Sequence, residues 1–239
     1  MKKVFFSCVA VATLMVFLSA SSVFAEGEAT KGNTGFYIGI SGGYVIPQTL
    51  TISDPDSSFK YTDATLKNGY LAGVTAGWLT PFTRRIMALE MEYNYIFGTD
   101  FDNGKIISVN LPQDLVGHGT FDGTIRIHAL LFNAKARYPE GRFHPYAGFG
   151  LGYAYSQVGD ITVRGPGGSV IIPSESGGAF CWQLMTGLDF DITPNFSVGV
   201  GYKYFATKPT IGDKDSEERI YVATDYKASI VTVGLAYTF

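Results

Sequence analysis

Two pairs of like-charged residues, each two positions apart, lie within segments of alternating residues. Glu90 and Glu92 form one pair, and Lys135 and Arg137 form the other. Side chains two residues apart on a β-strand point to the same face. If the two segments pair as antiparallel strands, the carboxylates come near the level of the two cations. The chemistry that this spacing predicts is ion pairing in a confined space.

Asp189 and Lys203 occupy the same row of their own segments and are expected to join these four residues in one network. An unpaired charge is costly in a low-dielectric interior, which favours mutual neutralisation. Two interpretations stay open. The network is either a structural plug, or a gate in which the ion pairs exchange partners and open a thin water path.

Two glycine-rich motifs do not fit nucleotide or phosphate binding. GFGLG, residues 148–152, runs through a strand pattern with no following helix. RGPGG, residues 164–168, lacks the GK[ST] ending that positions phosphate and metal in a phosphate-binding loop. We therefore expect no cofactor.

The histidines and the most acidic run do not predict a metal site. His118, His128 and His144 lack metal-ligand spacing and are expected at the surface. The run DKDSEE, residues 213–218, lacks the glycine and the ligand order of a calcium loop, and a solvated loop is expected there. We expect neither a metal nor a catalytic residue.

Eight segments of alternating residues must position the charges. Each is about as long as a tilted strand that crosses a lipid bilayer. In the third segment, Leu89, Met91 and Tyr93 alternate with Glu90 and Glu92, so one face is large and apolar while the other carries carboxylates. The eight segments are residues 35–44, 69–79, 88–97, 125–138, 145–155, 179–190, 196–205 and a last one that ends at Phe239.

The second face of these segments distinguishes a membrane barrel from a soluble β-sandwich. In five segments that face carries Gly, Ala, Ser or Thr, which is too small for a normal solvent face but suits the interior of a narrow barrel. No stretch of about 18 apolar residues follows residue 25, so a transmembrane helix is not expected. The sequence predicts an all-β fold, an eight-stranded antiparallel up-and-down transmembrane β-barrel.

The connections between segments alternate in length. Short turns are expected around Pro81, at 139–144 and at 191–195, on the side of both termini, and long loops on the other side. Outer-membrane barrels have this asymmetry, with short periplasmic turns and long extracellular loops. Residues 161–172 are expected to form a projecting hairpin, because its arms are too short to be two further spanning strands.

The N-terminus is typical of a secretory signal peptide. Lys2 and Lys3 precede an apolar run, and cleavage is expected between Ala25 and Glu26. The expected domain boundaries are therefore residues 1–25 for the signal peptide and residues 26–239 for the barrel.

The charge of the mature chain does not indicate a nucleic-acid partner. Removing the two lysines from 18 basic residues leaves 16 against 21 acidic ones, and the sequence has no basic stretch that could neutralise phosphates. Cys181 is then the single remaining cysteine, so no internal disulfide is expected.

Three motifs resemble the small eight-stranded outer-membrane β-barrel family of Gram-negative bacteria, the OmpA and OmpX type. They are GFYIGISGGY at 35–44, HPYAGFGLGYAY at 144–155 and LAYTF at 235–239. The resemblance implies a barrel-only member in the cell outer membrane, in contact with membrane lipid and lipopolysaccharide. It also implies that Tyr237 and Phe239 are an assembly signal read by the barrel-assembly machinery.

Three functions are compatible with this sequence. The first is a non-enzymatic protein whose loops serve envelope integrity, adhesion or contact with a host or surface ligand. The second is a narrow porin-like channel for ions or small solutes, which the charged inner row favours. The third is a lipid-modifying enzyme.

Overall fold

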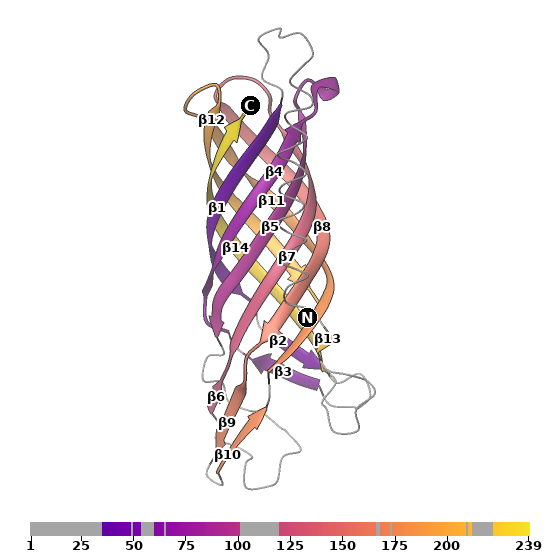
Figure 1. Ribbon diagram of the computed structural model, residues 1–239, viewed down its shortest axis with the longest axis vertical. Helices are drawn as coiled ribbons and strands as arrows, with labels where there is room; N and C mark the ends of the chain where they lie inside the picture. Colours follow the sequence, from indigo (N-terminus) through magenta and orange to yellow (C-terminus); the bar gives the residue numbers. More distant parts are fainter. Residues whose placement is uncertain are drawn as a thin grey trace.

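The protein is a closed barrel of antiparallel strands. The computed structural model describes residues 35–48, 50–53, 60–64, 66–100, 120–165, 168–172, 174–208, 210–211 and 222–239 (Figure 1). Eight of the described strands form the barrel, which confirms the predicted fold class. They are β1 (Phe36–Pro47), β4 (Gly69–Leu79), β5 (Met87–Asp100), β7 (Thr124–Arg137), β8 (Phe143–Val158), β11 (Glu175–Asp191), β12 (Phe196–Thr207) and β14 (Val222–Thr238).

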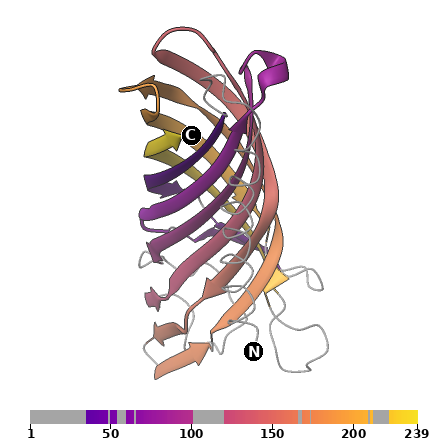
Figure 2. The ribbon, with the colours of Figure 1, turned by 45° about the horizontal axis from the view of Figure 1, so that its top comes forward.

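Each barrel strand pairs with its neighbours in sequence, and the last strand pairs with the first. The β14–β1 register runs from Thr238 opposite Tyr37 to Ala228 opposite Pro47. This pairing leaves no open sheet edge in the barrel wall. The strands are tilted against the barrel axis, as the side view of Figure 1 and the oblique view of Figure 2 show.

The two ends of the barrel differ, as the connection lengths predicted. At the short-turn end, the 3₁₀-helix η2 (Pro81–Thr83) and the turns at 138–142 and 192–195 join neighbouring strands. The strand ends at Tyr37 and Thr238 meet at this end too. The opposite end, called the loop end below, carries the longer connections. Among the described residues, no helix is long and apolar enough to cross a membrane.

Short strands extend the loop end. β2 (Leu50–Ser53) pairs with β3 (Lys60–Ala64) and with β14, and β13 (Thr210–Ile211) pairs with β14. β9 (Ile161–Gly165) and β10 (Gly168–Ile172) form the hairpin expected at 161–172, and β6 (Thr120–Asp122) joins it in a separate sheet. The hairpin projects beyond the barrel wall (Figure 1), so it adds no spanning strands.

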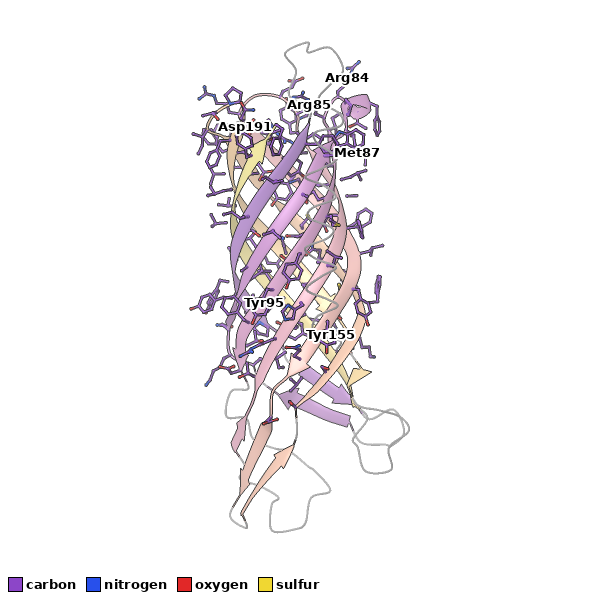
Figure 3. The ribbon with its side chains drawn as sticks, in the orientation of Figure 1. Arg84, Arg85, Met87, Tyr95, Tyr155 and Asp191 are labelled. Carbon is purple, nitrogen blue, oxygen red and sulfur yellow. The ribbon has the colours of Figure 1, made fainter. Side chains whose placement is uncertain are left out.

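The outward face of the wall is apolar. Ile40 on β1, Phe132 on β7 and Val233 on β14 each expose about half or more of their surface. Tyr95 and Tyr155 lie near the loop end, and Met87 near the short-turn end (Figure 3). A surface with this many exposed aliphatic and aromatic side chains suits acyl chains rather than water.

Several strands are longer at the loop end than the sequence suggested. β14 begins at Val222, well before the alternating row that was recognisable from Val231. Asp225 and Lys227 interrupt the apolar row there. Pairing with β12 and β2 holds this part of β14 extended, although its polar residues concealed it in the sequence.

Candidate functional site

The lumen, the space enclosed by the eight strands, is divided into two parts of different chemistry. The part nearer the short-turn end holds the charged residues, and the part nearer the loop end is apolar. We call the first the polar network, comprising Tyr37, Glu90, Glu92, Asn133, Lys135, Tyr146, Gln183, Asp189 and Lys203. We call the second the apolar cluster, comprising Val45, Leu66, Leu71, Ile96, Ile125, Ile127, Ala129, Leu131, Ala154, Cys181, Phe205, Tyr226, Ala228 and Ile230.

One ion-paired group of the polar network centres on Lys135 of β7. Its Nζ lies 2.8 Å from Glu90 Oε1 on β5 and 3.4 Å from Asp189 Oδ2 on β11. The Tyr37 hydroxyl donates to Glu90 Oε1, and the ring centroid of Tyr146 lies 4.5 Å from Lys135 Nζ. The ammonium group is thus enclosed by two carboxylates and an aromatic face, an arrangement that compensates a buried cation.

A second group centres on Glu92, which is 2% exposed. Its Oε1 accepts from Lys203 Nζ of β12, and its Oε2 accepts from Gln183 Nε2 at 2.7 Å and from Asn133 Nδ2 at 3.0 Å. Gln183 Nε2 also donates to Asn133 Oδ1 at 2.9 Å. Asn133 Nδ2 lies 3.5 Å from Glu90 Oε2 and so connects the two groups. Charge and hydrogen bonds therefore compensate the burial of Glu92.

Arg137 is separate from these ion pairs. Among the described residues it forms no salt bridge, and its buried Nε has no hydrogen-bond partner. It lines a lumen cavity of about 110 Å³ together with Glu90, Lys135 and Lys203. The sequence grouped Arg137 with the other five charged residues. The structure brings those five together in ion pairs and leaves Arg137 two residues nearer the short-turn end than Lys135 on β7.

Glycines on the inner row make room for the network. A Cβ atom at Gly150 of β8 would lie 2.0 Å from Asn133 Oδ1, and one at Gly77 of β4 would lie 2.2 Å from Tyr37 Cζ. Both distances are far below van der Waals contact, so these side chains occupy the space that glycine leaves open. The small inner row recognised in the sequence is therefore the counterpart of the large polar residues facing it.

Four members of the polar network were not identified as site residues from the sequence: Tyr37, Asn133, Tyr146 and Gln183. Each lies on the inward row of its strand, and Asn133 stands two positions before Lys135. The same period-two alternation that placed the charged residues inside the barrel also places these uncharged partners there.

The apolar cluster was not foreseen. Glu90 and its partners were expected to plug the lumen by themselves, beside an otherwise small inner row. Instead, Ile96, Ile127, Leu131 and Phe205 point inward and are at most 1% exposed. Large apolar residues follow the carboxylates on the same inner row. Side chains fill the interior of a narrow barrel at close packing, and apolar side chains can do this as well as polar ones.

The structure corrects the expectation of surface histidines at one position. His144 is 2% exposed. Its Nε2 lies 2.9 Å from Asp191 Oδ2, and its Nδ1 lies 2.7 Å from the carbonyl oxygen of Tyr138. It ties a turn to two strands at the short-turn end, a role invisible in sequence because Asp191 is remote along the chain.

The structure does not place His128 in a site with His144, the other histidine that it describes. His128 is half-buried on the outer wall, where its Nδ1 lies 2.7 Å from the Tyr93 hydroxyl and its ring stacks on Tyr95. His118 and the acidic run 213–218 lie outside the described residues, as do Ala25 and Glu26 of the expected cleavage site. No group of three metal-ligating side chains occurs in the described part of the chain.

The expected assembly residues lie on the outer wall at the short-turn end. The rings of Tyr237 and Phe239 meet edge to face with centroids 5.3 Å apart, and both are more than two-fifths exposed. The backbone N–H of Phe239 donates to the carbonyl oxygen of Phe36 at 2.9 Å. The two aromatics thus end the seam between the last and first strands and face outward.

Comparisons with known proteins agree with this architecture. A family model described as outer membrane protein beta-barrel domain matches residues 10–239. No curated protein sequence matches the chain significantly.

Solved structures with similarity to this chain include three outer-membrane or surface proteins. Neisserial surface protein A is 16% identical, covers 87% of this chain and 100% of its own, and has a TM-score of 0.45. OprG from Pseudomonas aeruginosa is 13% identical, with 89% and 99% covered and a TM-score of 0.48. Ail of Yersinia pestis is 16% identical, with 85% and 99% covered and a TM-score of 0.39. Similarity at this level does not extend to activity or ligands.

Proposed function

Because the chain belongs to the outer membrane protein beta-barrel family, we propose that it is a non-enzymatic scaffold whose sealed barrel holds its loops at the cell surface. In this proposal the short-turn end faces the periplasm and the loop end faces outward. The loops then serve envelope integrity, adhesion or contact with a host or surface ligand. Membrane lipid and lipopolysaccharide contact the apolar outer wall.

The observation that carries the proposal is the filled lumen. The apolar cluster lies across the loop-end part, where Ile127, Leu131 and Ile230 are at most 1% exposed. An ion loses its hydration when it enters such a region and finds no compensating ligand. A closed lumen favours display over conduction.

The polar network also supports a structural role over catalysis. Glu90 and Asp189 share the Lys135 ammonium, and Glu92 pairs with Lys203, so each of the three carboxylates is held by a lysine. A general acid or base must exchange protons with a substrate within hydrogen-bond reach. Carboxylates held by neighbouring cations in a lumen closed at one end are poorly placed for that exchange. A lipid A modification assay tests the enzyme alternative, and we expect no product.

The narrow-channel alternative predicts a different electrical result. Purified protein in a planar lipid bilayer is expected to give no discrete single-channel openings, because the apolar cluster seals the loop end. Lys135→Met alters the polar network alone and should leave the membrane equally silent. A general porin added to the same membrane verifies that openings are detectable. A channel gated by the polar network would be established if the wild-type protein gave discrete openings and the Lys135→Met variant gave openings of a different conductance.

We further propose export through a signal peptide cleaved between Ala25 and Glu26, followed by assembly at the outer membrane of a Gram-negative cell. Intact-mass measurement of the outer-membrane form tests the cleavage. The outward position of Tyr237 and Phe239 at the strand seam leaves their rings accessible to the barrel-assembly machinery.

Deletion of Phe239 tests the assembly role. We expect several-fold less folded barrel in the outer membrane, while export to the periplasm is unchanged. Folded barrel is measured by its heat-dependent mobility on a gel. Phe239→Tyr retains an aromatic end and is expected to assemble normally. Purified Phe239-deleted protein should still refold in detergent, because the deletion removes the backbone hydrogen bond to Phe36 and the ring contact with Tyr237 but leaves the β14–β1 pairing up to Thr238 in place. Normal assembly of the deleted form in cells would contradict the proposed signal.

A further inference from the structure

A second cavity of about 130 Å³ lies at the short-turn end of the lumen. Its lining is rich in polar groups from four of the turns and strand ends, including Arg85, Arg137, Asn195, Ser197 and Thr238. A single water needs roughly 10–15 Å³ of such volume, so the cavity has room for a molecule of several heavy atoms. The polar network and the apolar cluster close the lumen beyond it.

Arg137 lies where this cavity meets the lumen cavity of the polar network. Arg137, Ser197 and Thr238 line both cavities. The two lysines of the network each have a carboxylate partner, whereas the buried Nε of Arg137 has no acceptor among the described residues. A guanidinium presents donors in a planar fork that matches the oxygens of a carboxylate or phosphate. This Arg137 group is therefore suited to an acceptor that enters from outside the chain.

The second cation of the cavity is Arg85. It follows η2 with Arg84, and both residues have left-handed backbone conformations, with φ of 62° and 54°. Side chains other than glycine rarely adopt this conformation. The Thr83 hydroxyl donates to the Thr80 carbonyl oxygen at 3.0 Å and stabilises the turn. The turn thereby places Arg85 at the same end of the barrel as Asp191 (Figure 3).

Two aspartates near the cavity already have partners. Asp191 lines it but contacts His144 Nε2 at 2.9 Å, and Asp189 of the adjoining cavity is paired with Lys135. The Arg137 guanidinium therefore faces a carboxylate that already has a partner. Asn195 is also engaged, since its Nδ2 donates to the Thr238 carbonyl oxygen at 2.7 Å. The hydroxyl groups of Ser197 and Thr238 add donors of hydrogen bonds.

We propose that this cavity binds a small oxyanion. Arg137 is the main residue that contacts the anion, and Arg85 supplies a second positive charge. The ligand class is a tetrahedral or planar oxyanion with at least two acceptor oxygens, such as phosphate. The same chemistry occurs in free phosphate and in the headgroup of a phospholipid. Neither the family membership nor the display function assigns a ligand to this end of the barrel.

The test uses the full-length barrel in a neutral, lipid-free detergent. Isothermal titration with inorganic phosphate is compared with chloride at equal ionic strength, and a second arm uses short-chain phosphatidylglycerol. We expect saturable phosphate binding that sulfate displaces. Arg137→Met should weaken it at least about tenfold, because charge-assisted hydrogen bonds of the guanidinium are lost. Arg85→Met should weaken it by a smaller factor.

Arg126→Met is the matched control, since Arg126 is an exposed arginine at the other end of the same strand, β7. It should bind phosphate like the wild type. If Arg137→Met does not fold, as judged by gel mobility, Arg137→Lys keeps the charge without the fork and should bind more weakly than wild type. Arg137-dependent binding in the lipid arm alone would identify a headgroup as the ligand. Binding absent from both arms, or unchanged in the Arg137 variants, would overturn the proposal.

Discussion

Lys203→Met is expected to lower the free energy of unfolding by about 3–5 kcal/mol, the usual cost of removing one partner from a buried ion pair. Glu92 would keep its hydrogen bonds from Asn133 and Gln183 but lose the cation that neutralises it. Since Glu92 is 2% exposed, water cannot replace the ammonium without opening the lumen. Denaturant titration of the barrel in detergent, followed by tryptophan fluorescence, measures the change.

Two variants separate the buried pair from general effects of removing a lysine. Glu92→Gln combined with Lys203→Met removes both charges, so most of the lost stability should return. Lys208→Met removes an exposed lysine that lies 3.5 Å from Asp225, and should cost only about 0–1 kcal/mol. Equal stability of Lys203→Met and wild type would mean that the Glu92–Lys203 pair does not hold the lumen together.

Phe205→Ala is expected to have a similarly large effect on the apolar cluster, about 3–5 kcal/mol. Phe205 is 1% exposed, and its ring meets that of Tyr226 edge to face with centroids 6.3 Å apart. Truncation loses the transfer free energy of the ring and leaves a cavity enclosed by the wall. The same denaturant titration measures the loss.

Phe180→Ala is the matched control on the neighbouring strand β11. Phe180 is 60% exposed on the outer wall, where detergent or acyl chains fill the space that the ring leaves. Its truncation should therefore cost the transfer term without the cavity term, and destabilise clearly less than Phe205→Ala. Equal losses for the two variants would show that the loop-end lumen is loosely packed, and would weaken the proposal of a sealed barrel.

The strands and their two faces were readable because a strand has a period of two residues. The segment expected around residues 69–79 is strand β4, and the inward position of Glu90, Lys135, Asp189 and Lys203 followed from alternation. The diagonal approach of Lys135 to Glu90 followed too, since β5 and β7 are adjacent antiparallel strands. Alternation also placed Asn133 and Gln183 inside the barrel, but it did not indicate that these uncharged residues bind the carboxylates.

By itself, the sequence determined that eight alternating strands close into a barrel with an apolar outer wall and charges inside. Only the tertiary structure decided which inward residues meet. Glu92 finds Lys203 across the lumen, although β5 and β12 are separated by three other strands in the barrel wall. Contacts of this kind depend on the tilt and stagger of the whole closed sheet, which no single pair of strands encodes. The same closure packs Phe205 into an apolar cluster and leaves Arg137 between two cavities, because the space at each level is shared by all eight strands.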